Sequence, residues 1–414
     1  MTAKVDVIVV GAGVIGLSAA LMAQARGLTV MVLDRTGPAG GASAGNAGAF
    51  AFSDILPLAS PGILSKAPKW LLDPLGPLSI PPAYALQIAP WIYRFWRACS
   101  PTQVARSTLA QTALMDLSKD ELVPFLDLSG TADMLHRRGN LQVYEGKAEF
   151  AASLPGWQAR TDHGIAFDHL TASEMATLQP GLSAQFTYGT FTPEWYSISD
   201  PKLYTHALAD RFRAKGGEVR VAEVTKLDPQ NDGVTVWLAT GQALQGDKVV
   251  LAAGAFSHLL ARCVGDRIPL ETERGYNTTL PTGAFDLRMQ VTFGGHGFVA
   301  SPLSTGVRIG GAVELGGLKL APNYKRADAM LRKAQAFLPG IDPKGGVQWM
   351  GFRPSLPDSL PAIGRSRATS RVIHAFGHGH LGLTQSAGTA RLVADMLTGA
   401  PSAIDFTLFS PQRF

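Results

Sequence analysis

The sequence predicts an α/β protein with two domains: a Rossmann-type dinucleotide-binding domain and a second, α+β domain built on a large mixed sheet. Three observations lead to this prediction. The first 35 residues read as strand, glycine-rich turn, helix and strand. Residues 268–317 are rich in strand patterns, which predict an antiparallel or mixed sheet in the second domain. The length of 414 residues is enough for two domains with large cores.

The N-terminal unit begins with a continuous apolar run at 5–10, which is typical of a strand buried on both faces. The run meets the sequence Gly-Ala-Gly-Val-Ile-Gly at 11–16, and residues 17–26 then read as a helix that Gly27 ends. A second strand at 28–33 leads to Asp34. These parts follow one another in the order that a dinucleotide site requires.

Each glycine of the turn has its own task in such a site. Gly11 permits the tight turn, Gly13 lets the backbone approach a pyrophosphate at the helix N-terminus, and Gly16 lets the helix close on the strand. Asp34 is placed to accept hydrogen bonds from ribose hydroxyls, and its charge would repel a 2′-phosphate. A glycine-rich turn in another kind of α/β protein would leave Asp34 unexplained.

Residues 36–49 are mostly Gly, Ala and Ser, from which no core could be built. So many small residues indicate main chain packed flat against something large, and a flavin ring with its ribityl chain fits this description. Ser43 and Asn46 would offer side-chain hydrogen bonds. The alternative is a flexible linker. Linkers, however, seldom follow a nucleotide-binding unit directly and run into an apolar stretch such as 49–52.

Residues 55–100 are rich in Pro, Leu and Trp, with lysine or arginine beside the aromatic rings at 69–72 and 90–97. Short broken helices of this composition could lie at a membrane interface or form the packed lid of a substrate domain. We favour packing.

The remaining chain alternates helix and strand patterns. We expect helices at 104–128 (one or two, interrupted at Pro124), 147–154, 171–178, 202–214, 323–338 and from 385 to 397, and strands at 138–144, 218–227, 234–239, 248–253 and 372–376. Residues 190–201 read as a loop that ends with Asp200 as a helix N-cap and Pro201 at the first helical position. The strand at 248–253 ends in Gly254, which places a second backbone contact near the first nucleotide loop.

Composition excludes several classes of protein. No run of 18 apolar residues is unbroken, so we expect no membrane-spanning helix. One lysine precedes the first strand and no small-residue cleavage site follows, so we expect no signal peptide. Two cysteines cannot form a disulfide framework, which favours a reducing, cytoplasmic location, with peripheral contact to the inner face of the cell membrane left open. The net charge of +5 suits an anionic cofactor and a carboxylate substrate. Because no run of Lys or Arg is longer than two residues, the charge does not indicate a nucleic-acid partner.

Together these elements resemble the D-amino-acid oxidase superfamily of flavoproteins, most closely its D-amino-acid dehydrogenase branch. The likeness covers essentially the whole chain and rests on the motifs at 11–16 with Asp34, 43–48, 275–276, 351–354 and 377–384. The first motif is common to many flavoproteins, whereas the ordered set is specific. The resemblance implies a glutathione-reductase-like FAD domain formed by residues 1–60, 195–265 and 345–414. It also implies a substrate domain formed by 61–194 and 266–344, whose sheet covers the flavin.

The same resemblance implies FAD as the cofactor. Relatives that oxidise sarcosine attach the flavin to a cysteine near the C-terminus, but neither Cys99 nor Cys263 lies near 377–384, so we expect non-covalent FAD. The expected cofactor-binding residues are Gly11, Gly13, Val14, Ile15, Gly16, Asp34, Arg35, Ala42, Ser43, Asn46, Ala47, Gly48, Val224, Ala253, Gly254, Gly351, Gly379, His380, Leu381, Gly382, Leu383 and Thr384.

The family's reaction oxidises the carbon–nitrogen bond of an amino acid, with hydride passing from the α-carbon to flavin N5 and an imine as product. Arg353 matches the carboxylate-binding arginine, since a planar guanidinium can bind a carboxylate through two hydrogen bonds. Tyr276 matches a hydroxyl donor to the same carboxylate, and His380 could contact the ring or the substrate. The alternatives are a structural arginine, a core tyrosine and a structural histidine. His378 and His380 lack an obvious third ligand, so we expect no metal.

The expected substrate and electron acceptor rest on resemblance to particular members of the family. Residues 276–279 and 294–297 favour cis-4-hydroxy-D-proline or D-proline, with D-alanine-like amino acids as the other class. The dehydrogenase branch passes electrons to a quinone or an electron-transfer protein. The alternatives are a glycine- or sarcosine-type oxidase that uses oxygen, a non-catalytic flavin electron-transfer subunit, and a nicotinamide-dependent dehydrogenase. Segments 40–49 and 377–384 favour flavin over nicotinamide, which has no use for further ring contacts.

Overall fold

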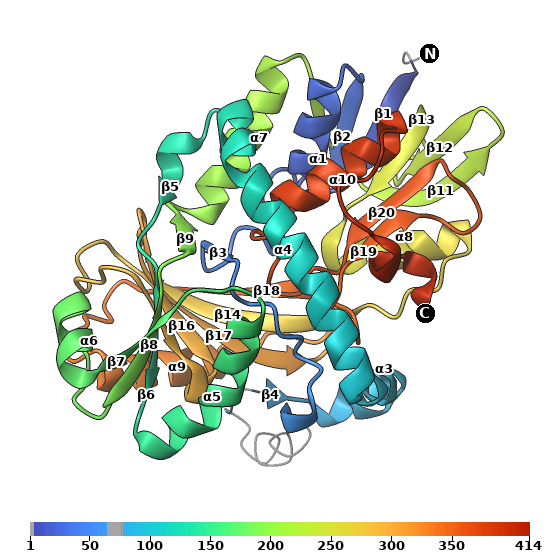
Figure 1. Ribbon diagram of the computed structural model, residues 1–414. Helices are drawn as coiled ribbons and strands as arrows, with labels where there is room; N and C mark the ends of the chain where they lie inside the picture. The colour runs from blue at the N-terminus through green and yellow to red at the C-terminus, as the bar shows by residue number, and fades with distance from the viewer. Residues whose placement is uncertain (1–3, 64–75, 77) are drawn as a thin grey trace.

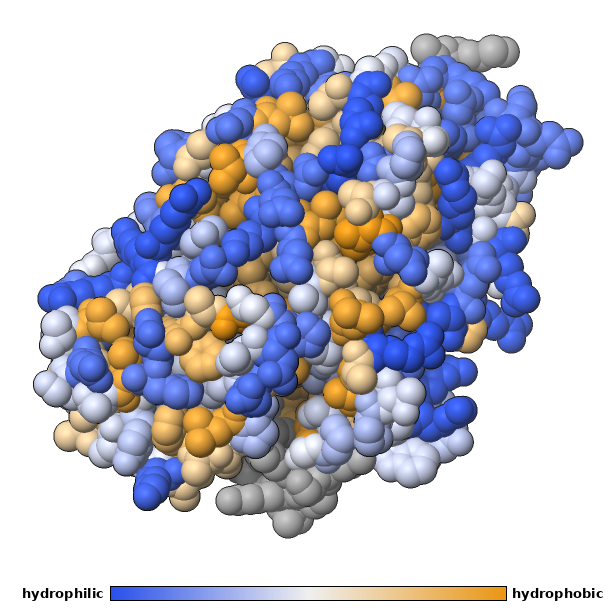
Figure 2. All heavy atoms as spheres, in the orientation of Figure 1, coloured by the Kyte–Doolittle hydropathy of each residue, from blue (hydrophilic) through white to orange (hydrophobic). Residues whose placement is uncertain are grey.

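A computed structural model describes residues 4–63, 76 and 78–414. The chain forms two lobes, each built on a large sheet, and the long helix α4 (Pro101–Ser129) crosses from one lobe toward the other (Figure 1). On the face drawn in Figure 2, hydrophobic residues lie scattered among hydrophilic ones rather than in one continuous patch. In the described ranges, no helix has the length and apolar character needed to cross a membrane.

The first sheet has a parallel core in the order β10-β2-β1-β13, and β20 pairs in parallel with β13. Its eight strands are β1 (Val5–Val10), β2 (Val30–Asp34), β10 (Glu218–Val221), β11 (Val224–Gln230), β12 (Gly233–Leu238), β13 (Ala243–Leu251), β19 (Ala362–Arg365) and β20 (Val372–Phe376). Since parallel strands end at one edge, the turn after β1, Asp34 and the residues after β13 are brought together.

Both faces of this sheet are covered, as the continuous apolar run of β1 predicts. Val7 and Val9 pack with α4 and with the helices α1 (Val14–Ala25), α7 (Pro201–Ala214) and α10 (Ser386–Thr398). Ile8 and Val10 pack on the opposite face with the β11–β12 hairpin and α8 (Ser257–Ala261).

The second sheet is mixed and has nine strands among the residues that the structure describes. They are β4 (Leu78–Ser79), β6 (Asn140–Tyr144), β7 (Asp168–Thr171), β8 (Tyr188–Thr192), β14 (Glu271–Leu280), β15 (Gln290–Phe293), β16 (Phe298–Leu303), β17 (Gly306–Leu315) and β18 (Val347–Ser355). The helices α6 (Ala172–Leu178) and α9 (Lys325–Phe337) pack in its core cluster. The observed architecture therefore confirms the α/β fold with a large mixed sheet in the second lobe.

Two further helices and a small third sheet accompany the two large sheets. The helices α3 (Ala85–Ala98) and α5 (Lys147–Asp162) flank the second lobe (Figure 1). A small sheet of β3 (Ala49–Ala51), β9 (Trp195–Ile198) and β5 (Leu135–His136) joins the glycine-rich segment to the chain before α7. The lysine-tryptophan stretch at 69–72 lies outside the described residues.

Several expected boundaries were wrong. Residues 190–201 are not a loop, because β8 ends and β9 forms within them, separated by a two-residue turn. Pro124 does not interrupt α4, and Pro155 lies inside α5, which continues to Asp162, so the flanking turns and their packing outweigh the missing N–H groups. The strand expected at 218–227 is two strands, since β10 pairs with β2 while β11 pairs with β12.

The placement of two elements bears on the division into domains. β18, which we assigned with 345–414 to the FAD domain, is a strand of the second sheet. α4, which we assigned to the substrate domain, packs with the helices of the first sheet. We therefore propose that the last boundary falls after Ser355 and that α4 belongs with the first lobe.

Candidate active site

A cavity of about 1050 Å³ runs from the glycine turn after β1 to the inner face of the second sheet. Its wall combines the turn, segment 34–49, residues 222–225 and 252–256, strands β14 and β18, and the loop at 379–384. These segments are far apart in sequence and meet where the two lobes face each other. A large, mostly apolar cavity with a few polar groups is typical of a cofactor site.

The glycine turn confirms the close packing expected of it. Gly11 has φ +116°, and a Cβ there would collide with the carbonyl oxygen of Ala252 at the end of β13. A Cβ at Gly16 would collide with the carbonyl of Gly11. Gly11, Gly13, Val14 and Ile15 line the cavity, whereas Gly16 acts from behind the wall by letting α1 approach.

The N-terminus of α1 faces this cavity. The Val14 N–H donates to Ser43 Oγ at 3.0 Å, and a Cβ at Gly13 would lie 3.1 Å from the same oxygen. Ser43 therefore lies directly against the helix N-terminus, where the backbone N–H groups and the helix dipole favour an anion.

Asp34 lines the cavity and also organises the turns around it. Its Oδ2 accepts the Ala12 N–H at 2.8 Å, and its Oδ1 accepts the N–H groups of Thr36 at 2.8 Å and Gly37 at 3.0 Å. Arg35 lies over the ring of Phe256, 3.6 Å from its centroid. Val224, Ala253 and Gly254 line the wall nearby, as expected.

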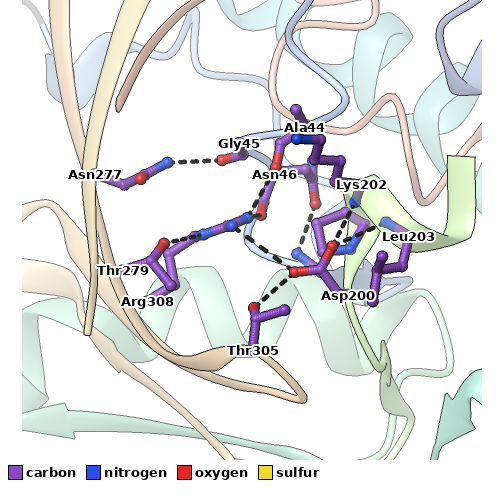
Figure 3. A network of polar contacts seen from close by, with 12 residues as sticks. Ala44, Gly45, Asn46, Asp200, Lys202, Leu203, Asn277, Thr279, Thr305 and Arg308 are labelled. Carbon is purple, nitrogen blue, oxygen red and sulfur yellow. Dashed lines mark hydrogen bonds and ion pairs between the residues drawn. The ribbon is translucent and has the colours of Figure 1, made fainter. Parts of the chain in front are cut away.

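Segment 44–47 is held by side chains of the second sheet (Figure 3). Asn277 Nδ2 donates to Gly45 O at 3.0 Å, and Gln290 Nε2 donates to Ala47 O at 2.9 Å. Arg308 Nη1 donates to Asn46 O at 2.5 Å and to Ala44 O at 3.2 Å. Sequence reasoning missed these three donors; the signal was their polar character within otherwise buried strands.

The expected cofactor residues of this segment have different positions. Ala42, Ser43, Asn46 and Ala47 line the cavity, while Gly48 lies behind them with φ +76°. The Asn46 side chain accepts the Gly48 N–H at 2.8 Å, so it shapes the segment itself.

The C-terminal loop closes another side. Residues 379–384 all line the cavity. Thr384 Oγ1 donates to Ala49 O at 3.2 Å and accepts the Ala51 N–H at 3.0 Å, which fixes the loop against the glycine-rich segment.

The two histidines of this loop differ. His380 is 37% exposed in its side chain and lies 3.1 Å from Asp54 Oδ2, another residue of the wall. His378 is buried against Thr389 Oγ1 at 3.0 Å, and burial lowers its pKa to about 3. Among the residues that the structure describes, no group of three or more His, Cys, Asp or Glu side chains could hold a metal ion.

Arg353 lies on the cavity face of β18. Its Nη1 donates to Ala312 O at 2.9 Å and its Nη2 to Gly311 O at 3.4 Å, and the guanidinium covers Gly275, where any Cβ would collide with it. Burial lowers the pKa of Arg353, and the charge of Glu273 opposes this shift. Gly351 also lines the cavity, beneath the Trp349 ring.

Tyr276 does not present its hydroxyl as we expected. The hydroxyl donates to Glu314 Oε1 at 3.0 Å and accepts the Asn323 N–H at 3.0 Å, within the core shared with α9. Tyr276 is among the residues that line the cavity, as are Gly275 and Asn277, but its hydroxyl points into the core, because side chains alternate along β14. The alternative of a core tyrosine is therefore the better description.

The residues that line the cavity fit FAD by their geometry and chemistry. No side chain could be added at Gly11 without blocking the turn, and the α1 N-terminus beside Ser43 suits a pyrophosphate. Asp34 would hold the ribose of FAD, and the glycine-rich segment and the 379–384 loop, which line the same cavity as Arg353, would hold the flavin.

Comparison with known proteins agrees with this fit. The model of the DAO family, described as FAD-dependent oxidoreductases, matches residues 6–396. The chain belongs to this family. It is an FAD-dependent oxidoreductase, which excludes the nicotinamide alternative.

Two curated relatives cover nearly the whole of this FAD-dependent oxidoreductase. The D-amino-acid oxidase of Bradyrhizobium diazoefficiens is 36% identical over 99% of this chain and 98% of its own. The D-amino acid dehydrogenase of Rhizobium rhizogenes is 30% identical over 99% of each chain.

Solved structures share the fold. Glycine oxidase from Geobacillus kaustophilus superimposes with a TM-score of 0.77 at 21% identity over both whole chains. L-proline dehydrogenase from P. horikoshii superimposes with a TM-score of 0.76 at 18% identity, over 100% of this chain and 98% of that one. At such identities the likeness establishes the fold and does not distinguish among substrates.

Proposed function

We propose that this FAD-dependent oxidoreductase oxidises the carbon–nitrogen bond of a D-amino or D-imino acid to an imine. The two curated relatives named above support the substrate class by their names. When bound, FAD accepts the hydride. The chain's own residues bind and orient the substrate.

Arg353 carries this proposal. Its guanidinium is buried in the cavity wall, fixed over Gly275 by two carbonyl groups, and in the described part of the chain no carboxylate lies within ion-pair distance of it. A buried, preorganised guanidinium without a carboxylate partner suits the carboxylate of a ligand. A flavin subunit that only carried electrons would have no use for it.

Within this class we propose cis-4-hydroxy-D-proline or D-proline first, and D-alanine-like amino acids second, with non-covalent FAD. Cys99 is buried, Cys263 is exposed, and neither belongs to the cavity wall. We propose a quinone or an electron-transfer protein as the acceptor.

The experiment is anaerobic mixing of the FAD-loaded protein with a panel of D- and L-amino acids. The panel includes D-proline, cis-4-hydroxy-D-proline, glycine and sarcosine. Bleaching of the flavin band by D-substrates alone supports the proposal, and bleaching by glycine and sarcosine alone would replace it with the oxidase alternative. Admitting air afterwards tests the acceptor, because slow return of the colour supports a dehydrogenase and fast return an oxidase.

We expected residues 55–100 to pack rather than to contact a membrane, but because one side of α3 is exposed, we also propose that α3 rests on an anionic membrane surface, where a quinone would be found. Leu86, Tyr93 and Trp96 are 91%, 57% and 55% exposed and recur at helical spacing. Arg94 and Arg97 are exposed on the same helix, Arg106 is exposed on α4, and the sequence has no acidic residue from 74 to 115. Apolar and aromatic side chains with flanking arginines match a bilayer interface that carries negative charge.

The side of α3 opposite to these exposed residues reaches the site, since it carries Trp91, Ile92 and Phe95, which line the cavity. Sedimentation with vesicles of phosphatidylcholine and phosphatidylglycerol tests the surface. The triple variant L86Q/Y93S/W96S should lose binding, whereas L203Q, which changes an exposed leucine on α7, should keep it. Failure of the wild-type protein to sediment would refute the membrane contact.

A further inference from the structure

Glu273 is a buried carboxylate on the cavity face of β14. It is only 6% exposed, and it lies on the same side of the strand as Gly275 and Asn277, among the residues that line the cavity. Throughout the described part of the chain, no side chain or backbone group forms a hydrogen bond or ion pair with its carboxylate, although its backbone is paired in the ladders of β14. The carboxylate is largely withdrawn from water and acts on the charge of Arg353, but it lacks the hydrogen bonds that usually accompany such burial.

Other carboxylates of this sheet accept hydrogen bonds from the protein. Glu271, two residues earlier, accepts the Tyr84 hydroxyl at 2.8 Å and the Thr272 N–H at 2.7 Å. Glu314 accepts from Arg274 at 3.1 Å and from Tyr276 at 3.0 Å. Glu273 therefore differs from its neighbours in having an acceptor available toward the cavity.

The cation directly across the β14–β18 ladder is Arg353, whose charge Glu273 influences, yet the two do not form an ion pair. Glu273 and Arg353 are direct partners in the β14–β18 ladder, so their side chains leave the sheet on the same face. The Arg353 guanidinium instead extends over Gly275 and is fixed by the carbonyls of Gly311 and Ala312. The cavity wall thus presents one positive and one negative group side by side, each free to meet a ligand.

We propose that Glu273 binds the cationic amino nitrogen of the substrate while Arg353 binds its carboxylate, so that the cavity recognises a zwitterion through both charges. This inference rests on the proposed function, because it takes the ligand to be an amino acid. The nitrogen could be the α-amino group, including the ring nitrogen of an imino acid, or a second amino group on the side chain. Either would donate hydrogen bonds to the unpaired carboxylate.

Binding to the FAD-loaded protein tests the inference without turnover. Aminoisobutyrate has no α-hydrogen and cannot be oxidised, isobutyrate is the same molecule without the amino group, and ε-aminocaproate carries its amino group at the far end. Dissociation constants are measured from the change in the flavin spectrum. E273Q keeps the shape and removes the charge, so we expect it to weaken aminoisobutyrate about tenfold or more and isobutyrate less than about twofold.

The three ligands distinguish between the two amino groups that Glu273 could bind, the α-amino group and a side-chain amino group. Weakening of aminoisobutyrate assigns Glu273 to the α-amino group, and weakening of ε-aminocaproate alone assigns it to a side-chain amino group. R353M should weaken isobutyrate and aminoisobutyrate alike. E271Q, a change of the same kind two residues away on β14, is the matched control and should leave the ratio of the two constants unchanged.

The inference is overturned if E273Q, with FAD bound and the thermal midpoint retained, weakens no ligand or weakens isobutyrate as much as aminoisobutyrate. If E273Q does not fold, E273D replaces it: its side chain is shorter by one methylene, which withdraws the carboxylate from the ligand nitrogen, so aminoisobutyrate should again weaken more than isobutyrate. The proposed function fails by a different result, namely that no D-amino acid bleaches the wild-type flavin.

Discussion

Arg308, on β17, donates from Nη1 to the main-chain oxygen of Asn46 at 2.5 Å, and so ties the second sheet to the glycine-rich segment of the FAD site (Figure 3). The same guanidinium bonds Ala44 O and, through Nε, Thr279 Oγ1 at 3.0 Å. Its Nη2 lies 4.0 Å from Asp200, which caps α7. One buried cation therefore fixes the position of the segment relative to both lobes.

Replacing Arg308 with methionine should weaken FAD binding by about tenfold or more, because two carbonyl groups of the segment lose their donor. Titration of the apoprotein with FAD, followed by flavin fluorescence, measures the dissociation constant. T305V is the control, since the Thr305 hydroxyl donates to Asp200 Oδ2, at 2.9 Å, and not to the segment. Equal FAD affinity in R308M and the wild-type protein would show that the segment is held without this contact.

Gly11→Ala should abolish FAD binding or folding, since the new Cβ meets the carbonyl of Ala252 and the backbone has φ +116°. Gly27→Ala is the matched control: its φ is +85°, but the space around it is open. The control should lose about 1 kcal/mol of unfolding free energy and retain FAD. Two measurements distinguish G11A from G27A: the FAD content of the purified protein, and the free energy of unfolding in urea. An FAD-replete G11A protein would contradict the tight turn.

Tyr276→Phe separates the structural from the substrate-binding role. The variant removes the donor to Glu314, so it should lower the free energy of unfolding by about 2 kcal/mol. The Michaelis constant for the best D-amino acid should change less than about twofold, because the hydroxyl faces the core. A Michaelis constant raised about tenfold with unchanged stability would restore the carboxylate-binding role.

His378 should make the protein less stable in acid. Its pKa in the folded protein is about 3, below the ordinary value near 6.5, so the unfolded chain binds the proton more readily. The stabilising contribution is complete above pH 6.5 and is lost progressively as the pH falls from about 6.5 toward 3, by about 1 kcal/mol per pH unit. Unfolding free energies of the wild-type protein and H378Q across this range measure the difference. Parallel pH curves for the two proteins would exclude His378 as the cause.

Much of the first lobe could be predicted from sequence because its signals are local. Glycines at fixed spacing, a buried strand and a terminal aspartate define the turn, and Asp200 and Pro201 define the start of α7. Both agree with the structure.

The second sheet could be predicted only as a class. Which face a residue of β14 presents depends on its register with β17 and β18, and one position separates the core-facing Tyr276 from the cavity-facing Gly275. The clamp of Asn277, Gln290 and Arg308 depends on pairing across more than 200 residues, which no local pattern encodes. Glu273 escaped notice for the same reason, since its lack of a partner is visible only in three dimensions.

The central claim is that Arg353 binds the carboxylate of a D-amino acid beside FAD, and anaerobic reduction of the flavin tests it most directly. The FAD-loaded wild-type protein and R353M are mixed with the best D-amino acid over a range of concentrations, and the rate of bleaching is recorded. We expect the wild-type protein to bleach with D- but not L-substrates, and R353M to require about a hundredfold higher concentration for the half-maximal rate. Equal concentration dependence in the two proteins, or no bleaching of the wild-type flavin by any amino acid, would contradict the account.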